Sequence, residues 1–152
     1  MTLQKPDILK YKGTEVRIWG NILFEYFENY PERLIRTPGL ITSLQRGYFA
    51  QFEVNKNNEL IIISLKRYID FDKEKGDFIP ETILDKAFPN SKKCEFFSSY
   101  IRIDNNYKNM EDSEFKLLEF ENGNLIKEHS LTKSELNELK KEKTVYNNVY
   151  SS

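Results

Sequence analysis

The chain has very few of the residues that build disulfides and zinc sites. Among its 152 residues there is one cysteine, Cys94, and one histidine, His129. A single cysteine excludes an internal disulfide, and structural zinc takes several Cys or His ligands that this chain does not have. Residues 1–16 also lack the apolar stretch and the small-residue cleavage site of a signal peptide. Together these absences predict a protein of the reducing cytoplasm.

Glycine motifs, long apolar runs and surplus positive charge are also missing. The six glycines are scattered and form neither G-x-G-x-x-G nor G-x-x-x-x-G-K, so we expect no phosphate cofactor. No run of ~18 apolar residues occurs, which predicts no membrane partner. The net charge is -1, whereas nucleic-acid-binding domains are usually basic. The segment "LKRYIDF" (65–71) therefore suits an amphipathic strand better than a platform for stacking bases.

One pair of residues has the chemistry of a nucleophile and its base, Cys94 with His129. Cys94 precedes a predicted strand, and neither a Gly-rich elbow nor a helix N-terminus lies beside it to lower its pKa. A serine nucleophile in a G-x-S-x-G context is also missing. The simpler interpretation is a buried thiol and a surface imidazole, so we predict that the chain is not an enzyme.

The segment 70–81 has part of the ligand spacing of a calcium loop. Four acids occupy positions one, three, five and twelve of an EF-hand-like pattern: Asp70, Asp72, Glu74 and Glu81. Lys75, however, stands where the glycine of the sharp turn belongs, and no helix is predicted before the segment. A solvated acidic loop over residues 70–78 is the favoured interpretation.

Aromatic residues are abundant, with 11 Phe and 9 Tyr. A disordered chain is poor in such residues, so most of this chain is expected to fold. Its length suits one domain around one core. We predict a single domain over residues 1–152, with an ordered core at about residues 8–143 between polar termini.

The most regular pattern is "RGYFAQFEVNKNNELIIISL", residues 46–65. Four residues alternate onto one face of a strand: Tyr48, Ala50, Phe52 and Val54. The polar cluster at 55–58 predicts a turn, because Asn tolerates left-handed backbone angles. The returning strand, 60–65, is almost wholly apolar, so the hairpin is expected at the centre of a sheet rather than at its edge.

The remaining chain predicts further strands and helices between loose ends at 1–7 and 144–152. Strands are expected at 14–20, at 94–104 and, as a hairpin turning at Asn122-Gly123, at 114–131. Helices are expected at 21–31 (for which a strand is the alternative), at 80–88 with Pro80 in its first turn, and at 131–143 with a capping box from Thr132 and Glu135. This order predicts an α+β domain, a mostly antiparallel β-sheet with two or three helices packed on it.

Two registers are possible for the hairpin at 114–131. A two-residue loop places Glu119 opposite Ile126. A three-residue loop places Glu119 opposite Lys127 and Phe120 opposite Ile126. We favour the second register because it makes better cross-strand pairs.

The stretch 104–128 carries more acids than bases. An acidic face can steer a basic partner, although ordinary solubilising charge is the plainer interpretation. The candidate partner-binding residues are Asp104, Tyr107, Glu111, Asp112, Glu114, Glu119 and Glu121.

The block at 46–65, followed by "AFPN" (87–90) and "KLLEFENGNLIKE" (116–128), resembles a group of small bacterial proteins. Those proteins carry a Trp-Arg-Gly-Tyr-x-Ala-x-(Trp/Phe)-Glu strand, a polar turn and a Leu-rich strand. The matching residues are Arg46, Gly47, Tyr48, Ala50, Phe52 and Glu53. Gln45 departs from the pattern, because a tryptophan often stands there. The resemblance covers residues 21–128 and implies an immunity protein of the kind encoded beside secreted toxins.

Two hypotheses of different classes follow. The first is a cytoplasmic immunity protein that binds and neutralises a cognate bacterial toxin domain, since exposed Tyr and Trp side chains suit interface anchors. The alternative is a small-ligand-binding domain or a carboxylate-dependent hydrolase, which requires a deep pocket with at least two inward acids. A module that self-associates through an exposed strand edge is a third possibility, and the oligomeric state is left open.

Overall fold

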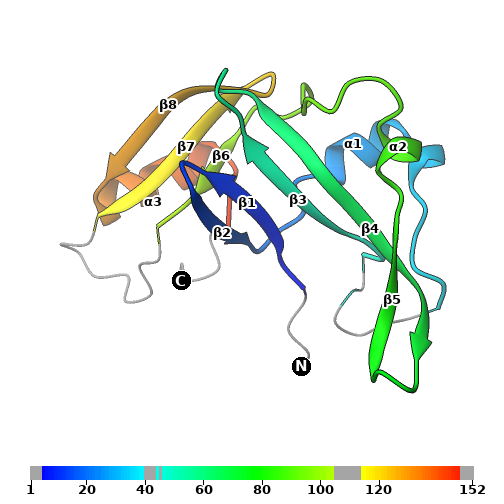
Figure 1. Cartoon of the computed structure of the whole chain (residues 1–152). Coiled ribbons are helices and arrows are strands. Elements are labelled where there is room, and N and C mark those ends of the chain that lie inside the picture. The colour runs from blue at the N-terminus through cyan, green and yellow to red at the C-terminus, as the bar shows by residue number, and fades with distance from the viewer. Residues whose placement is uncertain (1–4, 40–43, 45, 105–113, 148–152) are drawn as a thin grey trace.

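The computed structural model describes residues 5–39, 44, 46–104 and 114–147, which form an α+β fold of two mostly antiparallel sheets (Figure 1). The strands are β1 (Asp7–Tyr11), β2 (Thr14–Ile18), β3 (Phe49–Val54), β4 (Leu60–Asp72), β5 (Asp77–Thr82), β6 (Tyr100–Arg102), β7 (Phe115–Glu121), β8 (Asn124–Leu131) and β9 (Val145–Tyr146). The helices are α1 (Phe24–Asn29), the 3-10 turn η1 (Pro31–Arg33), α2 (Leu84–Ala87) and α3 (Lys133–Glu142). The predicted fold class is confirmed, with two sheets in place of one.

The five-stranded sheet has the order β2-β1-β3-β4-β5. β1 corrects the loose start expected at residues 1–7. It begins at Asp7 and pairs antiparallel with β2 and in parallel with β3. Lys12 and Gly13 join β1 to β2 with φ of 49° and 77°, the positive angles of a tight hairpin turn. The strand is short and Leu9 is its only fully buried apolar residue, so its alternation is weak in the sequence.

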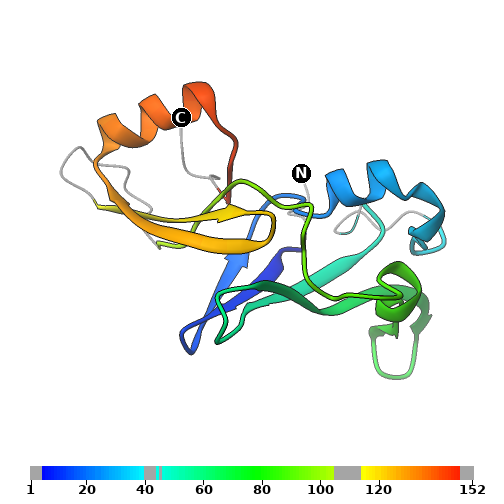
Figure 2. The same cartoon turned by 90° about the horizontal axis from the view of Figure 1, so that it is seen from above.

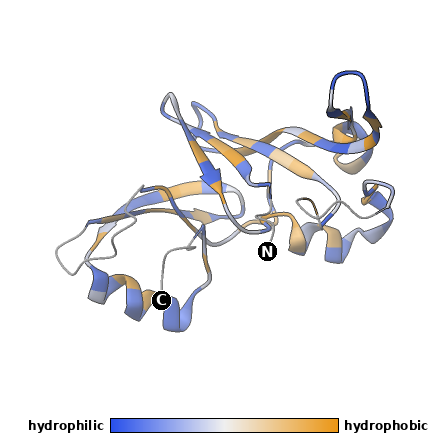
Figure 3. Cartoon of the chain, turned by 90° about the horizontal axis from the view of Figure 1, so that it is seen from below, coloured by the Kyte–Doolittle hydropathy of each residue, from blue (hydrophilic) through white to orange (hydrophobic). Residues whose placement is uncertain are grey.

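The hairpin predicted at 46–65 is confirmed as β3 and β4. Tyr48, Ala50 and Phe52 are buried on one face, and Asn58 closes the turn at a φ of 58°. Both strands lie inside the sheet order, as the apolar return strand predicts. Figure 3 shows hydrophobic and polar residues alternating along the strands.

The acidic loop expected at 70–78 is instead the end of a second hairpin. β4 continues to Asp72, and β5 returns to Thr82, so Pro80 lies in a strand and not in a helix. β5 is the last strand of its sheet, where a residue without an N–H is tolerated. The helix predicted at 80–88 shortens to α2, although its apolar residues Ile83 and Phe88 are buried as expected.

The four-stranded sheet has the order β8-β7-β6-β9. Of the strand predicted at 94–104, only Tyr100–Arg102 forms β6. The tail predicted at 144–152 contains β9, which pairs in parallel with β6. The Asn147 side chain accepts a hydrogen bond from the Trp19 backbone and donates one to the Arg102 carbonyl, and these bonds tie the segment to both sheets.

The β7–β8 hairpin combines the two registers considered for it. Glu119 lies opposite Lys127, as favoured, but Phe120 lies opposite Leu125. A bulge between Glu119 and Phe120 absorbs the difference, and it leaves Ile126 half exposed. The loop itself is the two-residue Asn122-Gly123 turn, so neither simple register describes the whole hairpin.

One hydrophobic core joins the two sheets and α1, while α3 packs on the four-stranded sheet through Leu136 (Figure 2). α3 begins with the predicted capping box, in which the Glu135 N–H donates to the Thr132 hydroxyl. Leu60 donates a backbone hydrogen bond to the Gly123 carbonyl, which links the two hairpin turns. No helix in the described part of the chain is both long and apolar enough to cross a membrane.

Candidate binding surfaces

The two residues with nucleophile and base chemistry lie in different surroundings. Cys94 is fully buried between the sheets, and burial raises the pKa of its thiol. The His129 imidazole lies 2.7 Å from the Glu119 carboxylate and beside the Tyr100 ring, at the surface of the four-stranded sheet. A thiol in this setting is a poor nucleophile, because desolvation disfavours the thiolate.

The four acids with calcium-loop spacing are spread over a hairpin. Asp70 and Asp72 lie in β4, whereas Glu81 lies in β5 and pairs with Arg67 at 2.9 Å. Asp72 accepts the backbone N–H groups of the turn, including that of Glu74 at 3.0 Å. Among the residues that the structure describes, no three potential metal ligands come together.

The acids predicted to bind a partner are only partly on one surface. Asp104 pairs with the buried Arg102 and accepts the Lys116 N–H, so its carboxylate serves the fold. Glu114 and Glu121 are exposed, and Glu119 holds His129. Tyr107, Glu111 and Asp112 lie outside the described residues.

Glu119 and Glu121 line a shallow groove of about 420 Å³ between β7 and the end of α3. A second groove of about 500 Å³ continues from it along α3, and the two share Tyr100 and Glu142. Their acids make this side of the four-stranded sheet a surface that attracts cations. Within the grooves, however, each acid is solvated or already paired, so the attraction acts mainly at long range.

A buried ion pair lies behind the Arg-Gly-Tyr motif. The Asp7 side chain is fully buried, and it accepts two hydrogen bonds from the Arg46 guanidinium and one from the Ala50 N–H at 2.7 Å. Burial raises the pKa of Asp7, while the Arg46 charge opposes that effect. The Arg46 Nε also donates to the Tyr48 carbonyl, so this arginine joins β1 to the start of β3.

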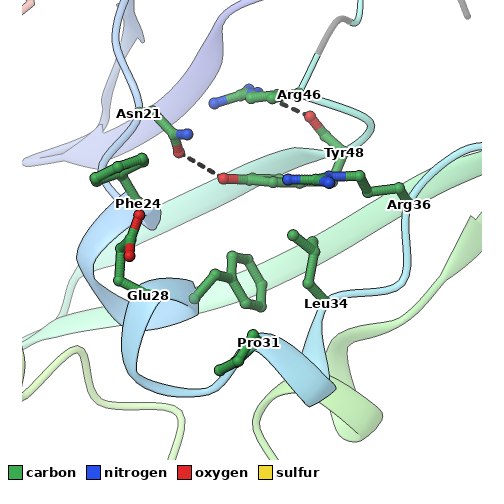
Figure 4. Close-up of a pocket in the computed structure, with 9 residues that line it drawn as sticks. Asn21, Phe24, Glu28, Pro31, Leu34, Arg36, Arg46 and Tyr48 are labelled. Atoms are coloured by element: carbon green, nitrogen blue, oxygen red, sulfur yellow. Dashed lines mark hydrogen bonds between the residues drawn. The ribbon is translucent and has the colours of Figure 1, made fainter.

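Beside this ion pair, a pocket of about 540 Å³ opens between α1 and the residues that precede β3 (Figure 4). Its apolar wall is formed by Phe24, Phe27, Pro31 and Leu34. The Tyr48 hydroxyl donates to the Asn21 side chain at 2.6 Å. Burial raises the pKa of Tyr48 to about 12, so its hydroxyl keeps its proton at neutral pH. Glu28 and Arg36 lie on opposite sides of the opening.

The outer part of the β4–β5 hairpin, residues 67–81, forms a two-stranded ribbon. β3 pairs with β4 only as far as Lys66, and β5 takes over from there. Beyond that residue no third strand pairs with β4 in the described chain. Figure 1 shows the ribbon extending away from the rest of the molecule.

A row of four aromatic rings follows one face of the sheet onto this ribbon. The ring centroids are 5.0 Å apart for Phe49 and Tyr68, 5.0 Å for Tyr68 and Phe78, and 5.1 Å for Phe78 and Phe71. Phe71 is 44% exposed and Phe78 39%. We call these four residues the aromatic stripe.

Neither the role of Asp7 nor the aromatic stripe is predicted from the sequence pattern. An acid at the first position of a strand is the only local sign of the ion pair, and its partner lies 39 positions away. The stripe has a clearer sign, because aromatic residues flank the polar turn at 73–76 on both sides. That pattern is typical of a hairpin with cross-strand aromatic pairs.

The chain matches no protein-family model, no curated protein and no solved structure. The resemblance to immunity proteins therefore stays a prediction.

Proposed function

We propose that the protein binds a partner protein through the aromatic stripe and that, as the resemblance implies, it is a cytoplasmic immunity protein holding a cognate toxin domain. The supporting observation is the exposure of Phe71 and Phe78 on a ribbon that projects from the domain. Clustered apolar side chains that stay in water commonly mark protein–protein contact sites.

The stripe has the properties of an interface anchor. Burying apolar surface contributes about 25 cal/mol per Å², and aromatic side chains supply much of it with few rotatable bonds. The rings already contact one another, so little ordering remains to be done when a partner arrives. Ile69 and Ile79 are exposed as well, which extends the apolar surface of the ribbon.

The acidic grooves have a different part in this proposal. Glu119 and Glu121 lie on the four-stranded sheet, away from the ribbon. Charges at the rim of a contact change the rate of association more than the affinity. We therefore assign the anchoring of the partner to the stripe and its long-range attraction to the acids.

The test is binding to the toxin domain that this proposal expects to be encoded beside the gene. The two purified chains are mixed and the dissociation constant is measured by calorimetry. Replacing Phe71 and Phe78 by Ser together is expected to weaken binding at least tenfold, roughly the effect of losing one interface hot spot. The matched control is Ile126→Ser, since Ile126 is 51% exposed but lies on the other sheet.

Failure of the two wild-type chains to form a complex would remove the immunity assignment. Equal binding by the wild-type chain and the Phe71/Phe78 variant would instead keep a partner but exclude the stripe as its anchor. Growth rescue on co-expression is the matching test in cells, and it should follow the measured affinities.

A further inference from the structure

The pocket beside α1 carries two charged side chains that no described residue pairs with. Glu28 and Arg36 are both exposed, and neither side chain makes an ion pair or a side-chain hydrogen bond with another described residue. They lie across the opening from each other, with an apolar wall between them (Figure 4). Arg46, the other cation of the pocket, is already neutralised by Asp7.

The rest of the pocket is neutral and fixed. Tyr48 stays protonated and donates to the Asn21 amide oxygen, and Arg46 is held by three groups besides Asp7. Among the described residues, the pocket charges left without an ion-pair partner are therefore one carboxylate and one guanidinium, on either side of an apolar surface. A ligand with a single charge would satisfy only one of them.

We propose that this pocket binds a small zwitterion with an apolar side chain, of the kind represented by a free aromatic or branched amino acid. Arg36 binds the carboxylate of the ligand, in the fork geometry that guanidinium groups favour. Glu28 binds the ammonium group. The side chain of the ligand packs on Phe27, Leu34 and the exposed ring of Phe24, and the pocket volume of about 540 Å³ is in the usual range for small-molecule sites.

This site is separate from the surface proposed to hold a protein partner. Tyr48 and Phe49 are consecutive residues, so they point to opposite faces of the sheet. Tyr48 lines the pocket, whereas Phe49 begins the aromatic stripe. The ligand proposal consequently does not rest on the immunity function, and the two can fail independently.

The test uses the full chain labelled with nitrogen-15 and three related compounds. L-Phenylalanine carries both charges, 3-phenylpropionate lacks the ammonium group, and phenethylamine lacks the carboxylate. Backbone amide shifts of pocket residues report binding even at a dissociation constant on the order of 1 mM. Phenylalanine is expected to saturate these shifts, and each analogue should bind roughly two- to fivefold more weakly, because an exposed ion pair contributes little.

The variants Glu28→Gln and Arg36→Gln should each weaken phenylalanine binding by the same two- to fivefold, roughly one exposed ion pair. Their matched controls are Glu25→Gln, on the same helix, and Arg17→Gln, on β2. Both control residues are exposed and neither lines the pocket, so they should leave binding unchanged.

Three results would overturn the proposal. One is the absence of saturable shifts with phenylalanine. Another is equal binding of all three compounds, which would indicate an apolar pocket with no use for the two charges. The third is a toxin domain that shifts the same amides and loses affinity with the Glu28 and Arg36 variants, because the pocket would then belong to the protein interface.

Discussion

Both halves of β4 carry large apolar residues, but these residues lie in opposite surroundings. In the first half, which pairs with β3, the side chains of Leu60, Ile62 and Leu65 are fully buried in the hydrophobic core. In the second half, Ile69 and Phe71 are more than two-fifths exposed. The strand is continuous, so the difference comes from what lies beside it. β3 leaves at Lys66, and beyond it β5 is the one strand in the described part of the chain that pairs with β4.

This comparison separates two uses of apolar side chains in one element. Those of the first half fill the interior and fix the sheet. In the second half, the rings of Tyr68 and Phe71 both contact Phe78 on the neighbouring strand β5. An isolated two-stranded hairpin is only marginally stable in water, so cross-strand aromatic contacts are needed to hold the ribbon in shape. The same rings remain accessible to a partner.

The largest expected effect comes from a matched pair of Phe→Ala substitutions. Phe52 is fully buried, and its truncation should lower the free energy of unfolding by about 4 kcal/mol through lost burial and the cavity left behind. Phe78→Ala removes the same atoms from the ribbon and should cost less than about 1 kcal/mol. Urea denaturation of both variants measures the difference. Similar losses would mean that the ribbon belongs to the cooperative core.

The next expected effect compares two arginine–carboxylate pairs. One joins Asp7 of β1 to Arg46, and the other joins Arg67 of β4 to Glu81 of β5. Asp7 is fully buried and its Arg46 partner is 16% exposed, whereas Arg67 and Glu81 at the base of the ribbon are 22% and 39% exposed. Asp7→Asn leaves a largely buried cation without its counter-ion and should cost about 3 kcal/mol. Glu81→Gln should cost less than about 1 kcal/mol, because water replaces the lost partner.

Chemical denaturation in low and high salt distinguishes these two cases. The loss from Asp7→Asn should persist in high salt, since buried pairs are screened weakly, whereas the small loss from Glu81→Gln should shrink. An Asp7→Asn protein as stable as the wild type would show that the hydrogen bonds to Arg46 and Ala50, and not the charge, stabilise this part of the sheet.

Much of the fold can be predicted from local pattern. The hairpin at 46–65, the short α1 and the capped α3 all follow from alternation, helical spacing or capping residues. These signals lie within a few positions of one another. The sequence interpretation was wrong at 70–82, because acids and lysines at the turn outweighed the flanking aromatics, and because Pro80 suits both a first helical turn and an edge strand.

The candidate surfaces were harder to predict, for a physical reason. The buried ion pair joins Asp7 to Arg46, and the pocket joins α1 to the segment before β3. Each depends on chain segments that meet only after folding. The exposure of the stripe depends on where β3 stops pairing with β4. The pattern of side chains along β4 does not show that position. The composition shows that aromatic residues are plentiful, but it does not show which of their side chains are exposed to solvent.

The smallest expected difference in stability is between alanine variants of two glycines with similar backbone angles. Gly47 has a φ of 83° and Gly76 a φ of 73°. Alanine is strained in this region by about 1 kcal/mol at either site. A Cβ on Gly76 would meet open space, whereas one on Gly47 would lie 2.7 Å from the Arg36 Cβ. Gly76→Ala should therefore cost about 1 kcal/mol, and Gly47→Ala about 2 kcal/mol because the contact must also be relieved.

The reason for the close approach at Gly47 is a backbone hydrogen bond. The Thr37 N–H donates to the Gly47 carbonyl at 2.8 Å, which holds the Arg36 segment directly against the glycine. Gly47→Ala should consequently move Arg36 as well as lower stability, and amide shifts around Arg36 and Tyr48 would report the movement. Equal losses for the two substitutions, with no shifts near Arg36, would show that this segment yields freely. The Arg36 segment, which forms part of the pocket wall, would then be as adaptable as the ribbon. The difference in rigidity would in that case hold for the two halves of β4 but not for the pocket.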